Sequence, residues 1–234
     1  MTAEDYKEGQ ILLIDKPLHW TSFQVVSKLR WAIRKHYNIK KIKVGHAGTL
    51  DPLASGLLVI CTGKMTKQID TFQGQEKEYS GTIVLGSTTP SFDLETEINE
   101  WFPTEHISES LIQETIKQFT GEIEQYPPVY SAIKKDGKRL YEFARAGKDV
   151  EIKSRTVHVS EFEITTIRNL ELDFRVVCSK GTYIRSLAHD FGKALNSGGH
   201  LSALRRTRIG DFGVENALTI DTFLNQLPSR NNRE

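Results

Sequence analysis

A glycine-rich stretch at residues 44–67, VGHAGTLDPLASGLLVICTGKMTK, holds the side chain best suited to chemistry. Asp51 lies in a short loop just before a continuous apolar run, which predicts a buried strand. The glycines allow sharp turns, so the loop would hold the carboxylate rigidly at the mouth of a cleft. A fixed carboxylate can act as a nucleophile or as a general base. Asp-Pro pairs are also common in ordinary turns, so a purely structural role stays open on the residues alone.

Other kinds of site fit the residues less well. The glycine spacing does not match a phosphate-binding P-loop, and no Gly-Lys-Ser/Thr follows it. The seven histidines and two cysteines show no metal-ligand spacing, so no metal is expected. Cys61 and Cys178 both lie in apolar runs and are predicted to be buried thiols. A disulfide is the alternative, but nothing else in the sequence suggests secretion.

Charge is segregated along the chain, although the net charge is only +1. Residues 28–67 carry nine Lys and Arg side chains against Asp51 alone, whereas residues 68–125 carry twelve acids and two lysines. Residues 180–210 again carry six basic side chains and one acid, Asp190. Either basic cluster alone could be a solvated helix face. Two such clusters beside motif-like stretches favour a polyanionic partner such as a nucleic acid.

Bulk properties indicate an ordinary globular chain. Its 234 residues are 38% hydrophobic and 26% charged, which suits one large domain or two small ones. The polar, acidic start MTAEDYKEGQ does not resemble a secretory or transit peptide, and no apolar run is long enough to span a bilayer. We expect a cytoplasmic protein. No heptad or long apolar patch calls for a partner, so we expect a monomer.

The elements that would position Asp51 follow from apolar periodicity and turn residues. A helix capped by Thr21 or Ser22 has its apolar positions at Phe23, Val26, Leu29 and Ala32. Strands are predicted at 11–17, 57–62, 78–86, 156–167, 170–180 and 201–212. Further helices are predicted at 64–72, 108–119, 182–195 and 220–227. Without repeats or a linker, this mixture predicts one α+β domain over residues 1–234, around a largely antiparallel or mixed sheet.

The stretch GHAGTLDPLASGLLVICTGKMTK closely resembles the catalytic motif of the TruB family of tRNA pseudouridine-55 synthases. In the family's order it is followed by EKEYSGTIVLG, YPPVYSAIKKDGKRLYEFARAG, RTVHV, CSKGTYIRSLAHDFG and GGHLSALRRTRIG. The resemblance runs from Leu12 to about Thr219. It implies a pseudouridine-synthase-like sheet flanked by helices, with an RNA-gripping insertion at about residues 126–151. It also implies tRNA as the partner and no cofactor.

The resemblance assigns three catalytic side chains. Asp51 matches the essential carboxylate of the family. Tyr79, in EKEYSG, matches a tyrosine that lies against the target base and can serve a proton transfer. Arg185 matches an arginine that pairs with the catalytic carboxylate and keeps it ionised. Without the resemblance, Tyr79 reads as a core residue and Arg185 as a surface residue.

The resemblance also implies contacts with the RNA. His46 matches a histidine that wedges into the tRNA loop where the flipped base was, and Leu204 matches a residue that lines the uracil pocket. Lys180 and Tyr183 share the motif of Arg185, with weaker claims to the pocket. Lys16, Lys64 and Lys67 are candidates for contact with the RNA backbone. In the insertion, the candidate phosphate contacts are Lys134, Lys135, Lys138, Arg139 and Arg145.

Two departures from the family pattern stand out. Many relatives carry a C-terminal RNA-binding PUA domain, and the few residues after Thr219 are too short for one, so we expect it to be absent. The motif reads GTLDP where some relatives have GALDP. An RNA-binding folding helper with incidental catalysis stays open as an alternative. A glycoside hydrolase ranks last, because no second carboxylate is evident near Asp51.

Overall fold

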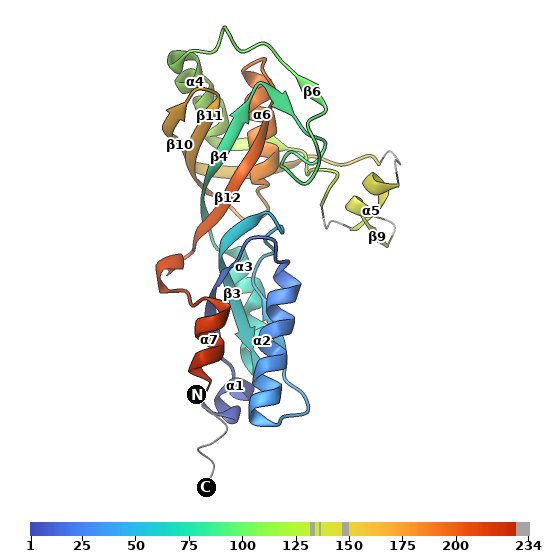
Figure 1. The fold of residues 1–234 in the computed structure, drawn as a ribbon, viewed down its shortest axis with the longest axis vertical. Coiled ribbons are helices and arrows are strands. Elements are labelled where there is room, and N and C mark those ends of the chain that lie inside the picture. The colour runs from blue at the N-terminus through green and yellow to red at the C-terminus, as the bar shows by residue number, and fades with distance from the viewer. Residues whose placement is uncertain (132–133, 136, 147–149, 228–234) are drawn as a thin grey trace. The chain divides into compact units, whose positions relative to one another are not determined.

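The computed structural model describes residues 1–131, 134–135, 137–146 and 150–227 (Figure 1). The chain forms two compact units. Unit 1 contains Met1–Tyr79 and Arg205–Glu234, and unit 2 contains Ser80–Leu204. The chain passes from one unit to the other within two strands, β4 (Lys77–Leu85) and β12 (Gly199–Ile209). Unit 2 is therefore an insertion in the sequence of unit 1.

Unit 1 contains short helices at both ends of its sequence and a longer helix near its start. Besides its parts of β4 and β12, its elements are α1 (Ala3–Glu8), β1 (Ile11–Lys16), α2 (Ser22–Tyr37), β2 (Val44–His46), β3 (Ala54–Thr62), η1 (Gly63–Gln68), α3 (Ile69–Gly74), β13 (Phe212–Gly213), η3 (Val214–Asn216) and α7 (Ile220–Gln226). The predicted helix at 64–72 is thus a 3₁₀ turn followed by a short α-helix.

The central strand of unit 1 is β3, which pairs with β1 on one side and β12 on the other. Strand β1 is antiparallel to β3, from Ile11 opposite Cys61 to Lys16 opposite Gly56. Almost every residue of β3 is buried, as its continuous apolar run predicted. Helices α2 and α7 cover these strands, and their side chains share one core cluster with Leu12, Ile14, Leu58 and Ile60.

Helix α2 begins where its cap predicted. The Thr21 side chain accepts a hydrogen bond from the Gln24 N–H, and the Gln24 side-chain oxygen accepts one from the Thr21 N–H. The buried face differs from the predicted one at one position. Val26, Leu29 and Ala32 are buried, but Phe23 is 67% exposed. A helix turns by about 100° per residue, so Phe23 points away from the buried stripe.

Unit 2 contains the strands and helices that lie between β4 and β12 in the sequence. Besides its parts of β4 and β12, its elements are β5 (Ser87–Thr88), β6 (Glu100–Trp101), α4 (Glu109–Ile116), η2 (Lys117–Phe119), β7 (Gly121–Gln125), β8 (Lys134–Lys135), β9 (Lys138–Arg139), α5 (Leu140–Arg145), β10 (Arg155–Arg168), β11 (Glu171–Cys178) and α6 (Ile184–Ala194).

The strands of unit 2 follow the order β12-β4-β11-β10-β7. The hairpin of β10 and β11 turns at Asn169, whose φ of 54° lies in the left-handed region that asparagine tolerates. Strand β7 is antiparallel to β10 and was not predicted. Helix α6 packs through Phe191, whose ring lies 5.6 Å from Phe119 and 5.4 Å from Phe162.

The predicted α+β fold around a largely antiparallel sheet is confirmed, with helices flanking the strands (Figure 1). The predicted insertion contains the short strands β8 and β9 and helix α5. The side chains of Lys134, Lys135, Lys138, Arg139 and Arg145 lie outside the described part of the structure, and their predicted phosphate contacts stay predictions. Within the described ranges, no helix is both long and apolar enough to cross a membrane.

Candidate active site

Asp51 lies half-buried in the loop that connects β2 to β3 in unit 1. Its carbonyl oxygen accepts a hydrogen bond from the Ala54 N–H at 3.1 Å, which closes a tight turn. The next carbonyl, that of Pro52, accepts a hydrogen bond from the His19 N–H at 2.8 Å. The turn expected from the Asp-Pro pair is therefore present, and the backbone that carries the carboxylate is fixed directly after it.

The residues before Asp51 are fixed as well. The Ser22 hydroxyl, at the start of α2, donates to the Leu50 carbonyl at 3.0 Å and accepts from the Leu50 N–H at 2.9 Å. Farther back, the Ala47 N–H donates to the Val59 carbonyl at 2.9 Å. Hydrogen bonds thus hold the loop from both sides of Asp51, which is the rigidity that catalytic positioning requires.

A buried guanidinium completes this loop. Arg206, on β12, donates from Nε to the Leu57 carbonyl at 2.8 Å and from Nη2 to the Gly48 carbonyl at 3.0 Å. Gly56 lies against the same residue, because a Cβ there would stand 2.3 Å from the Arg206 carbonyl oxygen. Its φ of +101° also favours glycine. One buried cation therefore joins a carbonyl of the loop, that of Gly48, to a carbonyl of β3, that of Leu57.

Lys16 is a second buried cation in unit 1. Its ammonium group donates to the Pro17 carbonyl at 3.0 Å and to the Trp20 carbonyl at 2.5 Å. Burial lowers the pKa of Lys16 to about 8; the negative charge of Asp51 opposes this shift, and the positive charge of Arg206 adds to it. Lys16 is therefore electrostatically linked to the candidate carboxylate, but its ammonium group is buried rather than presented to an RNA backbone.

His46 lies at the end of β2, beside the same loop. Its Nδ1 atom is buried and has no hydrogen-bond partner among the described residues. Burial lowers the pKa of His46, and the positive charge of Arg206 lowers it further, while a hydrogen bond with the Gly48 backbone acts in the opposite direction. The imidazole is thus biased towards its neutral form.

A cavity of about 550 Å³ lies next to Lys16. Arg205 borders it and makes a two-pronged ion pair with Asp15, at 3.0 and 2.7 Å. Trp20 and Lys28 complete its aromatic and basic wall. Lys16 therefore borders this cavity and also senses the charge of Asp51.

In unit 2, Arg185 lies in the first turn of α6 and is only 4% exposed. Its guanidinium donates to the Ser91 carbonyl at 3.0 Å and to the Tyr130 carbonyl at 2.9 Å. Its Nε lies 3.7 Å from Asp93 Oδ2, and both side chains are buried. Arg185 is therefore a buried, oriented cation and not a surface residue. Its predicted pairing with Asp51 joins residues of different units and stays a prediction.

The other predicted residues of unit 2 lie around Arg185 or on β12. Tyr183 caps α6, and its backbone exchanges two hydrogen bonds with the Gln125 side chain, at 2.7 and 3.0 Å. The Arg155 guanidinium lies 5.1 Å from the centre of the Tyr183 ring. Lys180 is exposed in the turn before α6, and Leu204 is half-buried on β12.

The remaining predicted residues belong to unit 1. Tyr79 is buried on β4. Lys64 and Lys67 are exposed on η1, where Lys64 forms an ion pair with Glu8 at 2.7 Å. The charge of Arg206 thus acts on Lys16 and His46, and its guanidinium bonds the loop of Asp51 at Gly48, whereas the two lysines of η1 lie on the surface beside α1.

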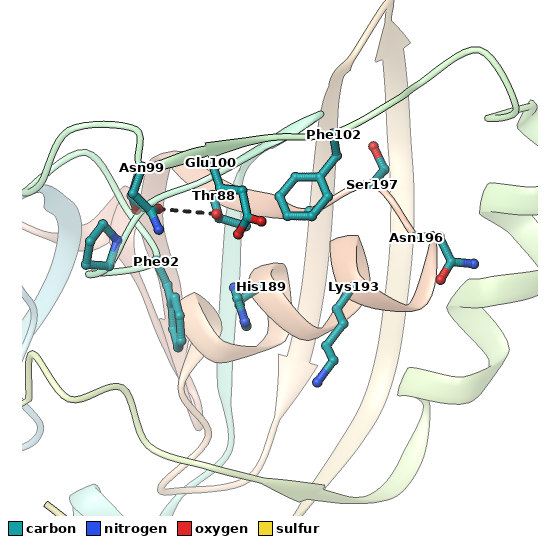
Figure 2. Close-up of a pocket in the computed structure, with 12 residues that line it drawn as sticks. Thr88, Phe92, Asn99, Glu100, Phe102, His189, Lys193, Asn196 and Ser197 are labelled. Carbon is teal, nitrogen blue, oxygen red and sulfur yellow. Dashed lines mark hydrogen bonds between the residues drawn. The ribbon is translucent and has the colours of Figure 1, made fainter. Parts of the chain in front are cut away.

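A second cavity, of about 560 Å³, lies in unit 2 and contains none of the predicted site residues (Figure 2). The rings of Phe92 and His189 are stacked at its wall, with centroids 3.9 Å apart. Phe92 has a φ of 65°, an uncommon backbone conformation for a bulky residue. Its neighbours in sequence, Ser91 and Asp93, both contact Arg185.

Sequence reasoning missed Arg206 and Asp93. An arginine in a strand and an aspartate in an acidic segment are ordinarily surface residues. One signal could have indicated Arg206. A glycine-rich loop packed against a buried strand leaves carbonyls without water, and these carbonyls need a donor with a long reach.

Comparison with known proteins identifies the family of this chain. The family description "TruB family pseudouridylate synthase (N terminal domain)" matches residues 34–184, and "tRNA pseudouridylate synthase B C-terminal domain" matches residues 185–234. The sequence and the fold are thus those of a pseudouridylate synthase. The chain belongs to the TruB family.

Full-length relatives support this membership. The tRNA pseudouridine synthase B of Flavobacterium johnsoniae is 66% identical over 224 residues, which cover 95% of this chain and 98% of the relative. The protein of the same name from Phocaeicola vulgatus is 57% identical over 219 residues, covering 94% and 93%. This chain therefore spans almost the whole length of these relatives.

Solved structures show the same fold in longer chains. A chain of a Cbf5-Nop10-Gar1 complex is 32% identical with a TM-score of 0.71, over 96% of this chain and 56% of that one. A chain of an H/ACA RNP bound to a substrate RNA containing 2'-deoxyuridine is 31% identical with a TM-score of 0.67, over 94% and 53%. This chain spans just over half the length of those two.

Proposed function

We propose that this protein converts uridine to pseudouridine in tRNA, at position 55 of the T loop, with Asp51 as the essential carboxylate. The tRNA substrate is supported by the names of relatives up to 66% identical along almost their full length. The observation that carries the role of Asp51 is its loop, which is fixed on both sides by hydrogen bonds and backed by the buried Arg206.

The reaction requires a carboxylate held in a fixed position. The N1–C1′ bond of uridine breaks, the uracil turns, and a C5–C1′ bond forms; the C5 hydrogen leaves to solvent and N1 gains a proton. A carboxylate can assist as a nucleophile or as a base. A rigid Asp51 would meet this need without reorganisation during the reaction.

Arg185 and Tyr79 are proposed as the partners of Asp51. Arg185 would pair with the carboxylate and keep it ionised in a dry site. Its guanidinium already has a fixed orientation, since it donates to the carbonyls of Ser91 and Tyr130. Tyr79 would lie against the target base and take part in a proton transfer. Its burial on β4 suits a ring that works away from water.

His46 is proposed to occupy the space that the flipped base leaves in the tRNA loop. A neutral imidazole suits stacking between bases, and both burial and Arg206 lower the pKa of His46. Leu204 would line the uracil pocket beside Lys180 and Tyr183. Lys64 and Lys67 are proposed as backbone contacts because both are exposed. Lys16 has a weaker claim to this role, since its ammonium group is buried.

The alternative is an RNA-binding helper that promotes tRNA folding and whose catalysis is incidental. Base flipping and release could help a tRNA to refold without any covalent change. The two roles can coexist in one protein, and removal of the carboxylate separates them.

Tritium release from tRNA transcript labelled with [5-³H]uridine tests the proposal. Wild-type protein should release the tritium of the isomerised uridine, and Asp51→Asn should release none while still binding the tRNA. Asp70→Asn is the matched control, because Asp70 is an exposed aspartate of the same unit and should leave release unchanged.

The outcomes are distinct. Release by Asp51→Asn at the wild-type rate would contradict the role of the carboxylate. Wild-type binding without release would favour the helper. A transcript in which only uridine 55 is replaced should release no tritium if the position is correctly assigned.

A further inference from the structure

Helix α2 presents two large aromatic side chains to solvent. Phe23 is 67% exposed and Trp31 is 53% exposed, although the buried stripe of the helix already contributes to the core of unit 1. Two exposed aromatic rings on one face of a single helix are candidates for a binding surface. The two aromatic rings are therefore accessible to a ligand from solution.

Basic side chains surround the exposed tryptophan. The Lys28 and Lys35 ammonium groups lie 5.6 and 4.6 Å from the centre of the Trp31 ring. Arg34 is exposed one helical turn beyond Trp31. The sequence from Lys16 to Leu50 contains no Asp or Glu. We call Phe23, Lys28, Trp31, Arg34 and Lys35 the aromatic–basic face of α2.

The aromatic–basic face is tied to the candidate active site. Ser22, next to Phe23, makes both hydrogen bonds with Leu50, the residue before Asp51. Lys28 also borders the cavity beside Lys16 and Arg205. A ligand on this face would therefore lie on the element that fixes the Asp51 loop.

We propose that the aromatic–basic face of α2 is a second contact surface for the substrate RNA, outside the catalytic loop. Lys28, Arg34 and Lys35 bind backbone phosphates, and an unpaired base or a ribose packs on Trp31. The identity of the RNA as substrate rests on the proposed function.

The charge and shape of the face favour RNA over a lipid surface. A helix that lies on a membrane needs a continuous apolar face turned outward. In α2 that face, with Val25, Val26 and Leu29, is buried against the strands. What remains outside is two separate aromatic rings among cations, a combination that matches bases and phosphates.

Equilibrium binding of unmodified tRNA transcript tests the aromatic part. Trp31→Ala should raise the Kd about tenfold, whereas Trp31→Phe should recover most of the affinity because a ring remains to stack on. Trp101→Ala is the matched control. Trp101 is 75% exposed on β6, beside Glu100 and far in sequence from any basic cluster, and its loss should leave the Kd unchanged.

Salt dependence tests the basic part. The double variant Lys28→Gln/Lys35→Gln should reduce the slope of log Kd against log salt concentration by about 1.5, since two phosphate contacts are lost. Lys7→Gln/Lys117→Gln is the control, because both lysines lie outside α2, are exposed, and pair with a glutamate three residues earlier in the sequence. This control should keep the wild-type slope. Thermal unfolding of every variant checks that the fold is retained.

The outcomes separate the two proposals. Active wild type with an unchanged Kd for Trp31→Ala overturns the RNA contact and leaves the proposed function standing. Weakened tRNA binding by Trp31→Ala, in a protein whose wild type releases no tritium, supports the contact and overturns the function. Binding of the face to anionic phosphatidylserine vesicles, with tRNA affinity unchanged in the variants, overturns the RNA contact in favour of a membrane surface.

Discussion

Lys16 is a buried cation whose pKa depends strongly on its surroundings. Its ammonium group has no exposed surface and is held by two backbone carbonyls. Burial is the main reason for its low pKa of about 8. The folded protein therefore binds this proton more weakly than the unfolded chain, for which the ordinary value is 10.5. Stability is then linked to pH through this one residue.

We predict the sign of that linkage. Between pH 8 and 10.5 the unfolded chain retains a proton that the folded state has released, so the free energy of unfolding rises with pH. Relative to Lys16→Met, wild type should gain about 2 kcal/mol between pH 7 and 9.5. Urea unfolding at both pH values measures this gain. Lys40→Met, which alters an exposed lysine, should show no such change, and a pH-independent difference for Lys16→Met would refute the linkage.

At the residue scale, the setting of a residue could be predicted from the sequence where the residues that create this setting are its neighbours in the chain. Asp51 could be placed in a tight loop before a buried strand, because the glycines, Pro52 and the apolar run are adjacent in the sequence. The partners of such residues could not be predicted in this way. Arg206 reaches Gly48 across more than 150 residues of sequence, and a single sequence carries no signal of that distance.

At the element scale, hydrogen bonds connect the start of α2 to the Asp51 loop. The helix begins with a capping box, and the next residue, Ser22, uses its hydroxyl to join the helix to Leu50. The first turn of α2 is thus part of the support of the candidate carboxylate. The helix was predictable from its cap and its periodicity, but the contact with the loop was not.

We expect Ser22→Ala to remove the connection between α2 and the Asp51 loop. The N–H and carbonyl of Leu50 would lose their partners in a buried setting, at a cost of about 2 kcal/mol in the free energy of unfolding. Tritium release should also slow, because Asp51 follows Leu50 directly. The control is Ser27→Ala on the same helix, whose hydroxyl makes only a long contact of 3.4 Å with Arg30. Equal effects of both substitutions on urea unfolding and on release would contradict this view.

Strand and helix boundaries show where local signals suffice. Ser108 caps α4 at the start of the helix predicted at 108–119, and Asn169 lies in the turn between the strands predicted at 156–167 and 170–180. Phe23 was assigned to the buried face because apolar spacing alone does not tell a core side chain from an exposed binding side chain. Strand β7 was missed because Gly121–Gln125 has a single apolar residue, Ile123, within an acidic segment, which is too little apolar alternation to indicate a strand.

At the scale of the whole molecule, unit 1 is built from two distant parts of the sequence. Residues of the second part, Ile220 and Phe223, belong to the same core cluster as those of β1 and α2. The Leu218 N–H and carbonyl bond to Leu13 and Asp15 on β1, each at 2.9 Å. The first part alone therefore lacks part of its core and one partner of β3.

We predict that a chain ending at Leu204 will not fold unit 1. Amides of β1 and β3 should exchange with deuterium as in an unfolded chain, because the end of β12 with Arg206, and all of α7, are missing from their surroundings. In the full-length protein the same amides should be strongly protected. Native-like protection of β3 in the truncated chain would show that the second part is dispensable.

The place of Arg206 in the chain has a consequence for synthesis on the ribosome. A domain translated as one continuous segment can fold as soon as that segment emerges. Here the loop around Asp51 is translated early, but the guanidinium that satisfies Gly48 and Leu57 is translated only after the whole of unit 2. The Asp51 loop of the nascent chain therefore lacks its buried cation until Arg206 has been translated. The apolar strands β1 and β3 are then exposed for the longest time. We therefore expect them to be the part of the nascent chain that most needs a chaperone.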